Sequence, residues 1–355
     1  DAGYGDYDWY RIRGAVSGPI IADTLSARLS FVTEERDGYL ENDAPASACP
    51  NGCDDLDEQD VSAFRAQLLF TPGEHTEVLF QAQYLWDEGA TGQKRLDPFP
   101  PPIPVGGGFF FDPYAGALPN SPDRRTVRAE ADENLDLWSR QFNLKITHLF
   151  EGLPGLGDVR FTSLTSRQEM EWKQTVDNDF SELPLTFTSW ETPSDQWLQE
   201  FQLASATEGA FQWLVGLFWF EEEVEMDFLF QDFAVFRFEN GGTIETSSFA
   251  AFTELSYDFE ESTGLPFTLR GGLRWTRDEK EGDDFLSLTL GPVGTPIAPA
   301  DSFEIDDEWK RLTGRLVGEY RIDEDVMVYL SASRGYKSGG VLIGNRVIET
   351  APGGG

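Results

Sequence analysis

Apolar and polar side chains alternate with a period of two along much of the chain. In residues 62–70, Phe64 and Leu68 fall on one face of an extended strand and Arg65 falls on the other. Two further segments with this pattern are 76–86 and 140–150. Such alternation indicates β-strands with one apolar and one polar face, and about twelve of them are predicted.

Several of these predicted strands are long. They run for about ten to eighteen residues, whereas the core strands of a soluble sandwich usually have about five or six. A tilted strand needs about nine to eleven residues to cross a membrane and can project beyond it. Strand length therefore favours a transmembrane β-barrel over a soluble sandwich.

The predicted connections alternate between short and long. Short turn-forming segments include "PGEHTE", "EGLPGLGD" and "DED". Long polar or Gly/Pro-rich loops are predicted near residues 37–60, 89–133, 176–194, 229–245 and 281–306. Short turns at one rim and long loops at the other are typical of outer-membrane barrels. We therefore predict an all-β fold: one domain, part of a large antiparallel transmembrane β-barrel with short periplasmic turns and long extracellular loops.

Composition and charge agree with a β-protein and exclude one class of partner. The 355 residues include 28 Phe, 10 Trp, 10 Tyr and 35 Gly, which favours strands and turns. The formal net charge of -36 repels phosphate backbones, so no nucleic-acid partner is expected. No run of eighteen apolar residues is present, so no helical membrane span is predicted.

The two cysteines lie four positions apart in the loop segment "ACPNGCDD". The intervening Pro and Gly favour a tight turn, so we interpret Cys49 and Cys53 as a small loop disulfide, with free thiols as the alternative. Two cysteines without a nearby histidine are too few for a zinc site.

No catalytic or metal-binding motif is present. The sequence has no Gly-rich phosphate loop, no nucleophile elbow and no histidine placed as a base, so the chain is not expected to be an enzyme. The acidic segments "DDLDEQD" and "FEEEVEMD" do not match a calcium-binding loop, and we interpret them as solvated acidic loops. Neither a metal site nor a cofactor is predicted.

Several separated segments resemble TonB-dependent receptors, the active transporters of Gram-negative outer membranes. The segments are "DYDWYRIRGAVSGPI", "LSARLSFVTEERDGYLEN", "WLQEFQLAS" with "FQWLVGLFWFEEE", "AAFTELSYDF" with "LRGGLRWTRDEKE", and "EWKRLTGRLVGEYRIDEDVMVYLSASRGYKSGG". They occur in the order and spacing of successive barrel strands. Within "SRGYKSGG", we expect a structural role at a strand end for the motif residues Arg334, Gly335, Tyr336, Lys337, Gly339 and Gly340.

The resemblance implies a barrel of about twenty-two strands whose lumen is plugged by a separate domain. Residues 1–355 are expected to form an internal part of that barrel, about twelve strands, since neither a plug nor a TonB-contact motif is found. The implied location is the outer membrane. The implied partners are membrane lipid and lipopolysaccharide, TonB through the plug, and a scarce nutrient ligand.

A ferric siderophore is the first expectation for that ligand, and a carbohydrate or another large nutrient is the second. The two histidines, His75 and His148, match no haem-binding pattern, which argues against haem uptake. Two other classes remain open from the sequence alone. One is a secreted all-β binding or hydrolytic protein, and the other is a passive porin or adhesin.

Candidate ligand contacts come from the longest loop. Aromatic rings can pack against siderophore rings or sugar faces, and arginine can pair with an anionic chelate. The candidates are Phe109, Phe110, Phe111, Asp112, Tyr114, Arg124 and Arg125. The same side chains could instead fold the loop on itself.

Tryptophan and tyrosine near strand ends predict aromatic girdles at the membrane interfaces. The predicted girdle residues are Trp86, Trp138, Trp172, Trp190, Trp219, Trp275 and Tyr329.

Overall fold

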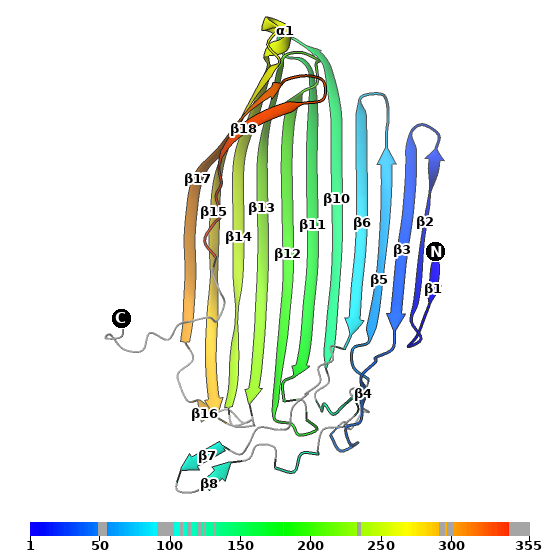
Figure 1. Cartoon of the computed structure of the whole chain (residues 1–355), viewed down its shortest axis with the longest axis vertical. Coiled ribbons are helices and arrows are strands. Elements are labelled where there is room, and N and C mark those ends of the chain that lie inside the picture. The colour runs from blue at the N-terminus through cyan, green and yellow to red at the C-terminus, as the bar shows by residue number, and fades with distance from the viewer. Residues whose placement is uncertain are drawn as a thin grey trace, which may run out of the picture.

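The computed structural model forms one large antiparallel sheet of long strands (Figure 1). It describes residues 1–48, 55–90, 103–106, 109–111, 115–118, 123, 125–130, 133–179, 181–232, 236–290, 295–296 and 301–340. The strands of this sheet are β1 (Ala2–Tyr4), β2 (Tyr10–Ile21), β3 (Leu25–Arg36), β5 (Gln59–Phe70), β6 (Thr76–Gly89), β10 (Asn134–Leu153), β11 (Gly157–Asp177), β12 (Thr186–Ser205), β13 (Phe211–Asp232), β14 (Phe236–Asp258), β15 (Phe267–Leu290), β16 (Thr295–Pro296), β17 (Asp301–Arg321) and β18 (Met327–Arg334).

Each long strand pairs with its neighbour in sequence. The order is β1-β2-β3-β5-β6-β10-β11-β12-β13-β14-β15-β17-β18, and the two-residue β16 pairs with the end of β15. Apart from the short β1 and β16, twelve strands make up this sheet, which confirms the all-β antiparallel prediction. Within the described residues, β1 and β18 are the outermost strands.

The predicted positions of three long loops were wrong. Strand β11 continues to Asp177 and β12 begins at Thr186, so most of the predicted loop 176–194 is strand. Likewise, strands occupy nearly all of 229–245 and much of 281–306. The physical reason is that these strands project far beyond the span that a membrane requires. Their Gly, Pro and acidic residues are typical of loops, although apolar side chains such as Phe228 and Phe230 still alternate with other residues along β13.

The sheet has one apolar and one polar face, which follow from the pairing register. Phe64 lies opposite Tyr84, and Leu68 lies opposite Phe80, so the four side chains share one face. We call it the apolar face. On it, Leu29 is 57% exposed, as expected for a side chain that meets lipid. Arg65, Gln67, Gln81, Asn143 and Lys145 occupy the opposite, polar face.

The register also corrects part of the predicted girdle. Trp86, Trp138, Trp219 and Trp275 lie on the apolar face, as a girdle requires. Trp172, Trp190 and Tyr329 lie on the polar face instead. A shift of one position along a strand reverses the direction of a side chain, and composition near a strand end does not fix that parity.

Turns and long connections lie at opposite ends of the sheet (Figure 1). At the short-turn end, the helix α1 (Phe259–Thr263) joins β14 to β15. Asp258 caps its start by accepting a hydrogen bond from the Glu260 amide, and Gly264 ends it with a left-handed φ of 72°. No helix within the described residues is long and apolar enough to span a membrane.

At the other end, two long connections pack against each other. The short parallel pair of β4 (Glu41–Asn42) and β9 (Thr126–Val127) joins them, and a second small pair is formed by β7 (Ile103–Gly106) and β8 (Phe109–Phe111). The two connections enclose a small apolar core made of Leu40, Leu56, Ala90, Val127 and Ala129. The Asn42 side chain holds this core together, because its Nδ2 donates to the Ala129 carbonyl oxygen and its Oδ1 accepts from the Ala129 amide.

Candidate functional site

The predicted loop contacts are only partly within the described structure. Phe109, Phe110 and Phe111 form β8, whose backbone is described, whereas Asp112, Tyr114 and Arg124 lie outside the described residues. Cys49 and Cys53, the predicted disulfide, lie outside them as well. The roles of these candidates remain predictions.

Arg125 has an evident packing role. Its Nη1 donates to the Tyr7 hydroxyl over 2.6 Å, and its guanidinium carbon lies 5.9 Å from the centre of the Tyr7 ring. Its carbonyl oxygen accepts a hydrogen bond from the Glu41 amide. Arg125 thus ties the longest connection to the turn between β1 and β2 and to β4. This geometry agrees with the alternative that the loop folds on itself.

The "SRGYKSGG" motif follows the edge of the sheet. Arg334 is the last residue of β18, and Gly339 lies against the Trp309 ring on β17. A Cβ atom at Gly339 would lie 2.4 Å from that ring, so only glycine fits the observed approach. The contact is consistent with the structural role predicted for this motif.

The two histidines lie toward the short-turn end of β6 and β10. The Thr76 hydroxyl and His148 Nδ1 are 2.8 Å apart, and His75 Nδ1 lies 3.7 Å from a Glu151 carboxylate oxygen. Both side chains have protein partners at the end of the sheet opposite the long connections.

Four aromatic rings form a continuous ladder on the polar face, near the end with the long connections. Trp172 and Trp190 stack with their ring centres 6.3 Å apart and an interplanar angle of 20°. Trp190 then contacts Phe228 at 5.6 Å, and Phe228 contacts Phe238 edge-on at 5.9 Å. Strands β11, β12, β13 and β14 contribute one ring each. We call these four residues the aromatic ladder.

A buried amide adjoins the ladder. Asn240 lies directly opposite Phe228 in the β13–β14 pairing and is 4% exposed. Its Oδ1 is buried and accepts no hydrogen bond from the described residues. A buried amide oxygen in this state is costly unless another donor reaches it. The ladder can offer stacking surfaces to a flat ligand, and the buried Asn240 oxygen lies beside it without a hydrogen-bond partner among the described residues.

A second site is a buried carboxylate cluster at the same end of the sheet. Carboxylate oxygens of Glu130, Asp177 and Asp179 all lie within 4.8 Å of one another. Asp179 accepts hydrogen bonds from the Ser181 and Thr186 amides and is 2% exposed, and Asp177 is fully buried. Burial, followed by repulsion from the two aspartates, raises the pKa of Glu130 to about 10. Such a cluster can share a proton or hold a hard cation through its oxygens.

Sequence reasoning did not find this cluster, because the whole β10–β11 hairpin separates Glu130 from Asp177 and Asp179 in the chain. The acidic segments that the sequence singled out lie elsewhere. The spacing Asp-x-Asp in "VDNDFSE" was the one local signal, since such pairs favour turns stabilised by side-chain hydrogen bonds.

The raised pKa of Glu130 predicts that its loop opens more easily as pH rises. Between the ordinary pKa near 4.5 and about 10, the folded state holds a proton that an opened loop releases, so protection falls with pH. The slope should reach at most about 1.4 kcal/mol per pH unit. Glu130→Gln, which carries no titrating proton, should remove this slope and increase protection of the Asp179, Ser181 and Thr186 amides at pH 8. Hydrogen exchange at several pH values measures this.

Glu151→Gln, near the end of β10 at the opposite end of the sheet, is the matched control and should leave the exchange of those amides unchanged. An unaltered pH slope in Glu130→Gln would contradict the shared-proton interpretation. Lower protection in Glu130→Gln, together with calcium-dependent protection of the unsubstituted protein, would show that the cluster holds a cation instead.

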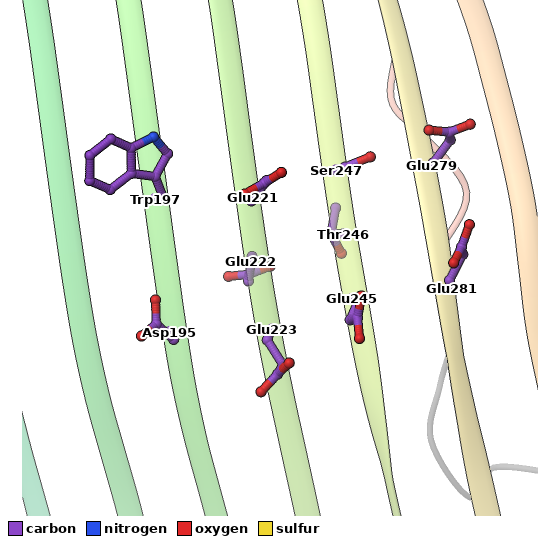
Figure 2. Close-up of a pocket in the computed structure, with 10 residues that line it drawn as sticks. All are labelled: Asp195, Trp197, Glu221, Glu222, Glu223, Glu245, Thr246, Ser247, Glu279 and Glu281. Atoms are coloured by element: carbon purple, nitrogen blue, oxygen red, sulfur yellow. The ribbon is translucent and has the colours of Figure 1, made fainter.

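Figure 2 shows an acidic groove across β12, β13, β14 and β15. In the pairing register, Asp195 lies opposite Glu223, Glu223 opposite Glu245, and Glu245 opposite Glu281. Like charges directly opposite one another destabilise a sheet, so this row requires solvent and counter-ions. The row lies on the same face as Phe64 and Tyr84, beyond the apolar side chains and toward the long connections.

Comparison with known proteins shows which family has this sheet. Residues 80–355 match the family of TonB dependent receptor-like β-barrels. The chain belongs to this family. The family lies in the outer membrane and consists of transporters rather than enzymes, so membership excludes the secreted soluble alternative.

Solved structures agree with the fold. The ferric yersiniabactin uptake receptor FyuA from Yersinia pestis matches with a TM-score of 0.65 and 18% identity, over 93% of this chain and 45% of its own. The ferric-catecholate import receptor Fiu from E. coli K12 matches with a TM-score of 0.55 and 13% identity, over 94% of this chain and 53% of its own. The chain thus spans about half the length of these receptors. At such identities the likeness shows the fold alone, and no curated protein matches the chain.

Family membership assigns the two faces of the sheet. The apolar face is the outside of a TonB-dependent receptor barrel and meets lipid, and the polar face lines the lumen. The aromatic ladder therefore lies on the lumen wall, near the rim with the long connections. Farther toward the short turns, the guanidinium of Arg274 lies 5.0 Å from the Phe218 ring and 5.5 Å from the Phe252 ring on the same wall.

Proposed function

We propose that this chain is part of the barrel of a receptor that takes up a ferric siderophore in a TonB-dependent way. The observation that carries the proposal is the aromatic ladder of Trp172, Trp190, Phe228 and Phe238, with the buried Asn240 beside it. Rings on a lumen wall provide stacking surface for the flat aromatic groups that many iron chelates carry.

The solved relatives support the same substrate class by their names, which include a ferric yersiniabactin uptake receptor, a ferric-catecholate import receptor and the siderophore receptor PiuA from Acinetobacter baumannii. Residues 1–355 would form part of the barrel domain of the complete receptor. In that receptor, ligand captured at the rim would pass inward when TonB acts on the domain that fills the lumen. The barrel itself would perform no covalent chemistry.

Transport assays test this proposal. The complete receptor, produced in a strain lacking its own siderophore receptors, should allow uptake of radiolabelled iron from at least one chelate in a panel of catecholates, hydroxamates and mixed chelates. Uptake should disappear in the same strain without TonB. Carbohydrate is the competing ligand class, because sugar faces also stack on aromatic rings. TonB-dependent uptake of oligosaccharides with no uptake from any iron chelate would replace the siderophore proposal.

A further inference from the structure

The lumen wall around the aromatic ladder is uncharged on all four strands that carry it. The ladder lies within the strand segments 170–176, 188–194, 224–230 and 238–244, and the pairing register points alternate residues of each segment toward the lumen. These lumen-facing residues are apolar, aromatic, hydroxyl or amide residues and glycine, and none of them is an acid or a base. The rings are therefore set in a neutral surface.

Charged residues do occur in the same four segments, but they lie on the opposite face of the sheet. Those residues are Glu171, Lys173, Glu191, Glu225, Asp227 and Glu239. Lys173, the one base among them, lies 3.1 Å from a carboxylate oxygen of Glu171 and 3.1 Å from one of Glu191. The neutrality of the lumen side thus comes from strand parity and not from a low content of charged residues.

The neighbouring strand β15 adds negative charge beside the ladder. Asp284 lies directly opposite Gly242 and faces the lumen. The first lumen-facing base on β15 is Lys280, about 13 Å farther toward the short turns, and it lies directly opposite Asp307 on β17. An anionic ligand on the ladder would therefore meet an acid before it met a base.

Bases in the described part of the longest connection are already engaged. Arg125 binds the Tyr7 hydroxyl, and an Arg128 guanidinium nitrogen lies 3.1 Å from an Asp43 carboxylate oxygen. The whole chain carries a formal net charge of -36, and the field of such a charge repels anions that approach the rim. Burial of an anion against a wall without a base adds a further cost. Both effects oppose an anionic ligand, and neither opposes a neutral one.

We infer that the aromatic ladder takes an electroneutral ferric chelate with aryl groups, and not the trianion of a ferric tris-catecholate. Iron(III) held by three singly charged donors, such as phenolates or hydroxamates, carries no net charge, whereas three doubly charged catecholates leave a trianion. Aryl groups of the chelate stack on the rings, and the neutral wall around them leaves no charge unpaired. The inference rests on the proposed function, since it specifies the class of ferric siderophore.

Binding of two model chelates to the complete receptor tests the inference. Ferric tris(benzohydroxamate) and the ferric tris-complex of a dihydroxybenzamide both present three aryl rings around the same metal, but the first is neutral and the second is a trianion. Excess free ligand keeps both complexes intact. Quenching of tryptophan fluorescence at physiological salt should give an affinity about tenfold higher for the neutral chelate. Equal or tighter binding of the trianion would overturn the inference and leave the siderophore proposal standing.

A base introduced on the lumen wall should weaken this preference. Gln174 faces the lumen directly opposite Trp190, so Gln174→Lys should raise the affinity for the trianion about tenfold and change the affinity for the neutral chelate little. Thr175→Lys is the matched control, because it adds the same charge to the same strand on the opposite face, and it should leave both affinities unchanged. Heat-modifiable migration in gels verifies that every barrel is folded. Equal effects of the two lysines would overturn the inference, because the wall beside the ladder would then not set the preference.

Iron uptake by cells separates this inference from the proposed function. TonB-dependent uptake from tris-catecholates but not from electroneutral chelates would overturn the inference while establishing a siderophore receptor. Absence of uptake from every iron chelate would instead remove the proposed function, and the inference with it. If neither model chelate binds, the net charge of the chelate that the receptor transports decides: a neutral one supports the inference, and an anionic one overturns it.

Discussion

Replacing Gly282 with alanine should open the projecting part of the β14–β15 hairpin. A Cβ atom at Gly282 would lie 2.1 Å from the Thr243 carbonyl oxygen and 3.1 Å from the Ile244 Cα. Both obstacles are backbone atoms of the paired strand, so no side-chain rotation can relieve the clash and the two strands must separate locally. The expected loss of local stability is about 2 kcal/mol or more. Hydrogen exchange of the amides in 241–246 and 279–285 measures it.

The matched control is Gly272→Ala on the same strand. There a new Cβ would lie 3.5 Å from Arg315 Cγ and 3.6 Å from the Thr253 carbonyl oxygen, which is ordinary van der Waals contact. Exchange in the projecting hairpin should stay unchanged in this variant. If both substitutions had the same small effect, the close approach of the backbones at Gly282 would not be a constraint on the hairpin.

This close approach matters for the candidate site, because β14 also carries Phe238 and Asn240. Gly241 and Gly242 follow these residues directly, and a Cβ atom at Gly242 would lie 2.1 Å from the Asp283 carbonyl oxygen. Three glycines therefore allow β14 to approach β13 and β15 closely where the ladder ends. Backbone packing in this region positions the last ring of the ladder and the buried amide.

The strands within the membrane were predicted from the sequence, but the full length of their projecting parts was not. In residues 62–70 the environment differs between the two faces, so side-chain polarity reports the strand directly. In the segment 220–227 of β13 the period of two persists, because apolar residues such as Val224 and Met226 alternate with acidic ones, but the many acidic residues led to its interpretation as a solvated loop. Pairing with neighbouring strands, which is a non-local effect, extends β13 to Asp232.

The candidate sites were less predictable than the fold, because each depends on which side a residue faces or on contacts between distant segments. Trp172 and Trp190 were predicted as girdle residues from their position near strand ends. Their membership of the ladder follows from strand parity and from a pairing register that joins four strands. The Glu130 cluster could not be predicted, because it depends on how the longest connection packs against the end of β11. Arg125, chosen for its charge, turned out to bind Tyr7.

Removal of Trp190, one of the two inner rings of the ladder, should have the largest effect on ligand binding. Trp190 contacts both Trp172 and Phe228, so Trp190→Ala removes one stacking surface and leaves its two neighbours without lateral support. Loss of a central aromatic contact in a binding site typically costs about 2 kcal/mol, which corresponds to roughly thirtyfold weaker binding. Isothermal titration calorimetry of the complete receptor, with the iron chelate that it transports best, measures the change in affinity. Trp172→Ala, at the end of the ladder, should have a smaller effect in the same direction.

Trp219→Ala is the matched control, because it removes the same ring from the same sheet on the lipid face, where Trp219 is 51% exposed. It should leave the affinity for the chelate unchanged, since no ligand in the lumen can reach that side of the wall. Equal affinities of Trp190→Ala and the unsubstituted receptor, with both barrels folded, would exclude the ladder as the capture surface. Binding would then have to rest on the long connections, where Phe109, Phe110 and Phe111 lie, and the siderophore proposal would lose the observation on which it is based.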